Sequence, residues 1–100
     1  MTYVVRDDGG TISVTEGTLT QIVIQAAEGV EGTRVRRTRR KLTLEIEDGR
    51  AQVELELAVA YGNVLPDVAQ DVQVRVTEAL TQMCGLDVSA VDVTVEELDA

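Results

Sequence analysis

The sequence predicts an α+β fold, a two-layer sandwich in which both helices lie on one face of a mixed sheet. Apolar residues recur at every second position in several stretches, which is typical of half-buried strands. In two other stretches they recur at every third or fourth position, as in amphipathic helices. The segments follow one another in the order strand, helix, strand, strand, helix, strand. We therefore expect one domain over residues 1–100 with all helices packed against one sheet.

The chain is organised around residues 51–80. One strand face is apolar and its other face carries Glu54 and Glu56, because successive side chains of a strand point to opposite sides. Gly62 and Asn63 then turn the chain into a helix that opens at Pro66 and stops at Gly85. The expected inward residues of the strand are Val53, Leu55, Leu57, Val59 and Tyr61, and those of the helix are Leu65, Ala69, Val72, Val76, Ala79, Leu80 and Met83.

Residues 1–8 form either an extra strand or a disordered lead, and a short strand through Ile12 and Val14 follows. The first helix begins at an N-cap that is either Thr18, which has Gln21 at the spacing of a capping box, or Thr15. Gly29 and Gly32 end this helix. Its apolar stripe consists of Leu19, Ile22, Val23, Ala26 and Val30.

The remaining strands alternate strictly. The Asp48-Gly49 dipeptide predicts a two-residue type I′ turn, so the strand before it should pair with the central strand as a hairpin. The whole order favours a ferredoxin-like arrangement, although the spatial order of the strands stays open. The inward residues expected are Leu42, Leu44 and Ile46 before the turn and Val91, Val93 and Val95 in the last strand, with Leu86 and Val88 covering the turn before it.

Length and composition narrow the class of protein. One hundred residues with 44% hydrophobic content suffice for one compact domain. The uncharged stretches are shorter than the ~18 to 20 apolar residues of a spanning helix, and Arg6, Asp7 and Asp8 interrupt any export signal. A single cysteine, Cys84, agrees with a reducing compartment. We expect a cytoplasmic protein.

The residue types exclude most catalytic chemistry. The chain has no histidine and one cysteine, so the commonest general base and a thiolate zinc site are both missing. Cys84 ends an apolar stripe and is interpreted as a small hydrophobe. Carboxylates at Glu45, Glu47, Glu54 and Glu56 are interpreted as a solvated sheet face rather than a cation site or an acid and base pair. We predict a non-enzyme without catalytic residues, cofactor, metal or small-molecule substrate.

Charge is distributed unevenly along the chain. Residues 1–50 hold eight basic and eight acidic side chains, whereas residues 51–100 hold only Arg75 against ten carboxylates, which gives the net charge of -9. Six of the basic residues form a run from Arg34 to Lys41, which we call the basic run. It could serve only to protect a sheet edge, or it could bind phosphates of lipid or nucleic acid, or carboxylates of another protein. Nucleic acid is disfavoured by the acidic half and by the scarcity of aromatic residues. The predicted partner-binding residues are Arg34, Arg36, Arg37, Arg39, Arg40 and Lys41.

Two segments carry a family resemblance. The first segment is the strand from Gly10 to Val14, the helix after it and the sequence Glu28 Gly29 Val30 Glu31 Gly32 that ends this helix. The second segment runs from Ala60 through Tyr61, Gly62, Pro66 and Ala69 to Val91, Asp92 and Val93. Over about residues 9–97 the chain resembles the alkaline shock protein family of bacterial envelope stress response proteins. It departs from this pattern after the first helix, where it is arginine-rich and many relatives are glycine-rich, and it is shorter than members with charged tails.

The resemblance implies a small non-enzymatic cytoplasmic protein in cell envelope homeostasis. It implies self-association and a membrane-anchored protein partner, through which the protein would be peripheral to the membrane. From the charge asymmetry itself we predict self-association that weakens with salt. The alternative function is a phosphate-binding module for anionic lipid or nucleic acid that uses the run from Arg34 to Lys41. No family residue is carried over as catalytic.

Overall fold

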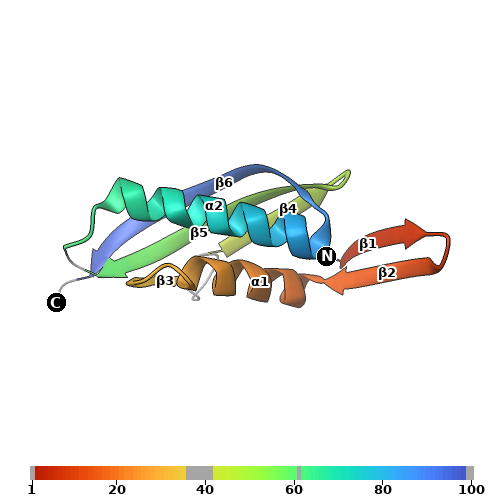
Figure 1. Ribbon diagram of the computed structural model, residues 1–100, viewed down its shortest axis with the longest axis horizontal. Coiled ribbons are helices and arrows are strands. Elements are labelled where there is room, and N and C mark those ends of the chain that lie inside the picture. Colours follow the sequence, from red (N-terminus) through yellow and green to blue (C-terminus); the bar gives the residue numbers. More distant parts are fainter. Residues whose placement is uncertain (1, 36–41, 61, 99–100) are drawn as a thin grey trace.

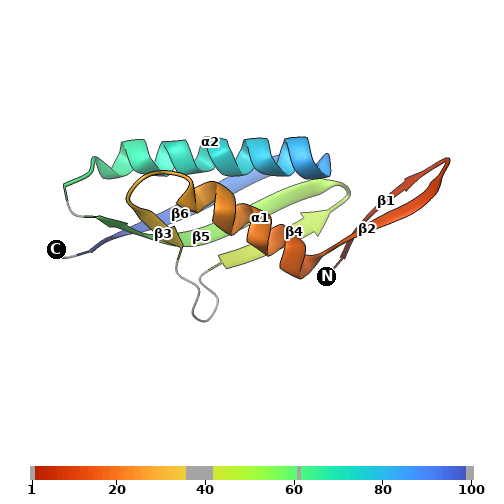
Figure 2. The ribbon, with the colours of Figure 1, turned by 60° about the horizontal axis from the view of Figure 1, so that its bottom comes forward.

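Strand β5 (Arg50–Ala60) lies at the centre of the main sheet in the computed structural model, which describes residues 2–35, 42–60 and 62–98 (Figure 1). Strands β3 (Thr33–Val35) and β4 (Leu42–Glu47) both pair with β5 antiparallel, whereas β6 (Asp87–Leu98) pairs with it parallel. Helices α1 (Glu16–Glu28) and α2 (Leu65–Cys84) cover one face of this sheet (Figure 2). The predicted two-layer α+β class is confirmed.

The two short strands behave as one interrupted strand along the same edge of β5. Val35 is the last residue of β3 and pairs with Leu57, and Leu42 begins β4 opposite Leu55. Six residues, 36–41, therefore separate Val35 from Leu42 along the chain, although their partners on β5 are only two positions apart. The only residue of β5 between these pairs is Glu56.

The core lies between the helices and β5, as the alternation predicts. Leu57, Leu80 and Leu19 are fully buried and come from β5, α2 and α1. The predicted core residues of the described chain form one cluster, in which Ile46 and Val93 are half-buried at its margin. Tyr61 lies outside the described residues. The buried members from the prediction are Val53, Leu55, Leu57, Val59, Leu44, Val91, Val72, Val76 and Leu80.

Backbone geometry confirms two predicted chain reversals. Asp48 and Gly49 have φ of 52° and 75°, so both central residues of the β4–β5 turn adopt the positive φ that a type I′ turn requires. Gly85 has a φ of 68° and its N–H donates to the Thr81 carbonyl at 3.0 Å. The next N–H, of the fully buried Leu86, reaches the Leu80 carbonyl at 3.3 Å. These bonds end α2 in a left-handed cap.

The structure decides one open helix detail and corrects another. Of the two N-cap candidates, Thr15 caps α1, because its hydroxyl accepts the backbone N–H of Thr18 at 3.3 Å. In α2 the buried stripe includes Val68, whereas Met83 is 68% exposed. Met83 has the angular position of the stripe, but it lies in the last turn of α2 and its side chain faces solvent.

The strand through Ile12 and Val14 does not join the main sheet. It is β2 (Gly10–Thr15), which pairs with β1 (Thr2–Asp7) as a separate antiparallel hairpin, so the lead segment is an extra strand (Figure 1). Both edges of β5 are already occupied, by β3 and β4 on one side and β6 on the other. In addition, β2 runs into α1 without a loop that could redirect it.

Candidate interaction surface

The sheet face opposite the helices is polar and strongly acidic. We call it the open face and define it by the outward positions of the three long strands, which alternate with the buried ones. Most of these side chains are exposed, and Glu56 is half-buried. Ala58 of β5 also occupies an outward position but is buried. The polar and charged residues of the open face are Thr43, Glu45 and Glu47 from β4, Arg50, Gln52, Glu54 and Glu56 from β5, and Asp92, Thr94 and Glu96 from β6.

Strand register brings carboxylates of different strands together on this face. Glu54 pairs with Asp92 across the β5–β6 ladder, and Glu45 lies opposite Gln52 on the other side of β5. Like charges directly opposite each other weaken a sheet by a few tenths of a kcal/mol to about 1 kcal/mol. The open face is therefore a surface of one predominant sign that favours a cationic partner.

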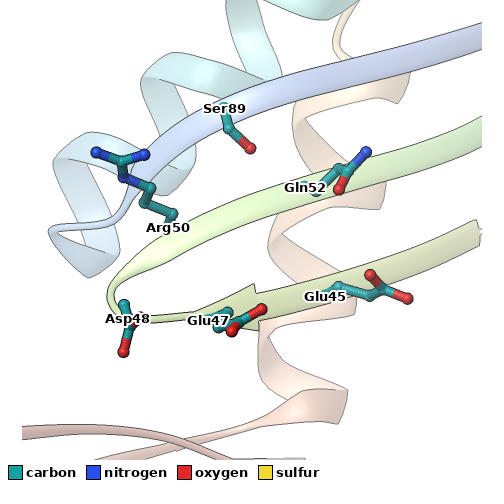
Figure 3. Close-up of a pocket in the computed structure, with 6 residues that line it drawn as sticks. All are labelled: Glu45, Glu47, Asp48, Arg50, Gln52 and Ser89. Carbon is teal, nitrogen blue, oxygen red and sulfur yellow. The ribbon is translucent and has the colours of Figure 1, made fainter.

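A shallow hollow of about 530 Å³ lies at the turn end of the open face (Figure 3). Its carboxylates Glu45 and Glu47 lie along β4, and the guanidinium of Arg50 points toward the β6 side. Ser89 is the extra residue of an irregularity in β6, and its hydroxyl donates to the Ala51 carbonyl at 3.1 Å. The lining residues are Glu45, Glu47, Asp48, Arg50, Gln52 and Ser89. Their side chains are exposed and polar, which suits contact with a partner surface.

The groups in and near the hollow are not arranged as an activated nucleophile or a metal site. Its serine hydroxyl is engaged with a backbone carbonyl rather than with a base. Within the described residues, no group of three or more histidine, cysteine, aspartate or glutamate side chains is arranged to hold a metal ion. Cys84 is half-buried at the end of α2, and burial raises the pKa of its thiol, which opposes formation of a reactive thiolate.

The predicted basic site is anchored to the same sheet. Arg34 belongs to β3, where its backbone pairs with Ala58, whereas Arg36, Arg37, Arg39, Arg40 and Lys41 lie outside the described residues. The run begins after Val35, whose N–H donates to the Glu28 carboxylate at 3.1 Å, and ends before Leu42. Its two ends are thus held on one edge of β5, and its role in binding stays a prediction.

Sequence reasoning grouped Glu45, Glu47, Glu54 and Glu56 but missed that Asp92 shares their face. The alternation of β6 shows that Asp92 points away from the core, yet only the pairing of β6 with β5 places it beside Glu54. Because strand order cannot be read from one sequence, no signal in the chain could have joined these residues.

Fold and surface together define a small α+β domain whose acidic sheet face is covered by neither α1 nor α2. Solved structures with this fold include a copper form of a MamM CTD variant, at 17% identity and a TM-score of 0.60, covering 85% of this chain and 100% of that chain. A cadmium form shares 19% identity at a TM-score of 0.58, covering 83% of this chain and 96% of the other. At these identities the likeness shows the fold alone.

The sequence itself places the chain in a family. Residues 33–100 match the alkaline shock protein 23 family, which has a cell envelope-related function, and the chain belongs to this family. The predicted resemblance is therefore confirmed. The curated proteins include no match to this chain. Neither α1 nor α2 has the length and hydropathy needed to span a membrane.

Proposed function

We propose that this chain is a non-enzymatic interaction protein with a cell envelope-related role, and that its open face binds the basic run of a second copy. The observation that carries the proposal is the acidic face, covered by neither helix, on the sheet whose edge also holds both ends of Arg34 to Lys41. The two surfaces have opposite charge, so each fits its counterpart on another copy. A contact between different surfaces can propagate into rings or open assemblies.

Self-association through these two surfaces requires many weak ion pairs acting together. An exposed ion pair contributes only ~0 to 1 kcal/mol, so several pairs and some apolar contact must combine to hold two copies. Salt shortens the Debye length from about 10 Å at 0.1 M to about 3 Å at 1 M, so the contact should weaken steeply over this range. In the cell, the proposed location is the cytoplasm, with membrane contact through an anchored partner protein, as the family resemblance implies.

Sedimentation velocity at low and high salt tests the acidic side of this contact. The triple variant Glu45→Gln, Glu54→Gln and Asp92→Asn removes three carboxylates from the open face without changing side-chain size. A matched control, Asp67→Asn, Asp71→Asn and Glu78→Gln, removes three exposed carboxylates from α2 in the opposite layer. We expect the first variant to lose the salt-sensitive part of self-association at low salt and the control to retain it.

The basic side is tested by replacing Arg36, Arg37, Arg39 and Arg40 with serine, which should abolish the same assembly while leaving the fold intact. Vesicles that contain anionic phospholipid separate the alternative function from this one. Salt-sensitive vesicle binding that the serine variant loses, in a chain that stays monomeric, would assign the basic run to phosphate groups instead. A wild-type chain that is monomeric at tens of micromolar in low salt would contradict the proposal.

A further inference from the structure

The hairpin of β1 and β2 stands apart from the rest of the molecule. Its strands pair only with each other among the described residues, and the hairpin extends beyond the end of the two-layer body (Figures 1 and 2). The described molecule is accordingly long and narrow, with extents of 52, 24 and 18 Å. A two-stranded hairpin is marginally stable in water by itself, so this one needs a further contact.

One face of the hairpin is apolar and only partly covered. Tyr3 and Val14 pair in register and are half-buried against the core. Ile12, two residues before Val14 and hence on the same face, is 56% exposed. The opposite face carries Val4 and Arg6, which pair with Ser13 and Thr11. The apolar face thus begins against the core and continues past the end of the body.

Strand β6 offers an edge that such a hairpin fits. Within the described chain it pairs with β5 on one side only, although it is twelve residues long. Val93 and Val95 alternate with Asp92 and Thr94 and lie on the helix-covered side, yet both remain half-exposed. A long edge strand with accessible apolar side chains is a template for another strand.

The hairpin of the same copy cannot reach this edge. Thr15 ends β2 and caps α1, which begins at Glu16, so no loop separates them. On the same face of the sheet, helix α1 packs over β3 at one edge, whereas α2 packs over β6 at the other edge. The hairpin therefore continues from α1 past the end of the body and does not run along the edge of β6, which leaves that edge to the hairpin of another copy (Figures 1 and 2).

We propose that β1 of one copy adds to the free edge of β6 of a second copy and extends its sheet. The helix-covered side then receives Tyr3 beside Val93 and Val95, and Ile12 of β2 lies on the same side one strand further from β6. Alternation along β1 consequently places Arg6 on the open face near Asp92, where a cation offsets the Glu54 and Asp92 repulsion. Arg6 of β1 is a positively charged, exposed residue on this face of the hairpin, whereas the residues of β2 on the same face, Thr11 and Ser13, are uncharged. This contact is distinct from the salt-sensitive one proposed above.

A pair of matched substitutions tests the apolar part of the contact. Ile12 and Val74 are 56% and 55% exposed, one on the hairpin and one on the solvent side of α2. In 1 M salt, where charge contacts are screened, we expect wild type and Val74→Asp to self-associate equally. Ile12→Asp should weaken the association by at least about tenfold, because docking would bury the new charge. Circular dichroism confirms that each variant is folded.

Disulfide trapping tests the location of the contact. In a Cys84→Ser background, a Val4→Cys chain is mixed with chains that carry Asp92→Cys, Thr94→Cys or a control cysteine, Asp71→Cys on α2. We expect a mixed disulfide with a β6 cysteine and none above background with the control.

Four results would overturn the proposal, three of them on self-association and one on lipid binding. One is a wild-type chain that stays monomeric in 1 M salt at several hundred micromolar; another is an equal effect of Ile12→Asp and Val74→Asp; the third is preferential cross-linking to Asp71→Cys. Binding of the wild-type monomer to phosphatidylcholine vesicles, lost in Ile12→Asp, would assign the hairpin to a lipid surface and would also overturn it. Because high salt suppresses the contact of the open face, either proposal can fail while the other holds.

Discussion

Leu57 lies in the middle of β5, fully buried among residues of the core cluster. Leu57→Ala removes its apolar contacts and leaves a cavity, so we expect the free energy of unfolding to fall by ~2 to 5 kcal/mol in a denaturant titration. Gln52→Ala, on the exposed face of the same strand, is the control and should change stability by no more than about 0.5 kcal/mol. A loss below about 1 kcal/mol for Leu57→Ala would contradict the register of the sheet.

Cys84 should behave as a structural side chain. Burial raises the pKa of its thiol, so near pH 8 the folded chain holds less thiolate than the unfolded chain. Alkylation by iodoacetamide should therefore be slower in the folded protein than in urea. The thiol has the lower pKa in the unfolded chain, so it ionises there first as pH rises. The contribution of the Cys84 thiol to the free energy of unfolding is therefore present below the pKa of the unfolded state and is lost as pH rises through the pKa of the folded state. Equal alkylation rates in both states would contradict this interpretation.

At the scale of single residues, the sequence predicted burial well wherever a period was unambiguous. Val53, Val59 and Val72 are fully buried as expected. It failed at Met83, because periodicity gives an angle around a helix but does not say whether other side chains cover that position in the last turn. Asp92 shows the same limit for the candidate surface, since its neighbour Glu54 is fixed by strand pairing rather than by spacing along the chain.

At the scale of elements, two glycines with open space around an added Cβ should respond in opposite directions. Gly85→Ala must hold an alanine at a φ of 68°, so we expect a loss of ~1 to 2 kcal/mol in unfolding free energy. Gly17→Ala lies within α1 with no positive φ, so lower entropy of the unfolded chain should give a gain of about 0.4 to 1 kcal/mol. Thermal unfolding measures both, and a shift of the same sign in both variants would contradict the assigned cap.

Element order was predictable, and the place of β2 was not. Local signals such as Asp48-Gly49 and Gly85 fix the β4–β5 turn and the end of α2, because each depends on backbone angles within a few residues. The sheet membership of β2 depends instead on which strands occupy the two edges of β5, and that competition is decided by packing of the whole chain. The alternation of Ile12 and Val14 is the same in either arrangement.

At the scale of the whole molecule, the charge asymmetry and the two-layer fold combine. The half of the chain with net charge -9 contributes most of β5 and all of β6, and therefore much of the open face, while the basic run joins this sheet at its opposite edge. The family match covers residues 33–100, so the hairpin and α1 lie outside the matched region. Function shared across the family is accordingly expected from the sheet and α2, and features of the hairpin are tested separately.

Hydrogen exchange should reveal this division between body and hairpin. In a dilute monomeric sample, amides of β5 exchange only through global unfolding, because the strand is paired on both sides and its inward side chains are buried. Amides of β1 and β2 should exchange far faster, since this hairpin has little tertiary support. At a concentration that drives assembly in 1 M salt, protection should rise in β1 and in β6 but stay low in Ile12→Asp. A hairpin as protected as β5 in the monomer would show that it packs on its own body and would refute its availability to a second copy.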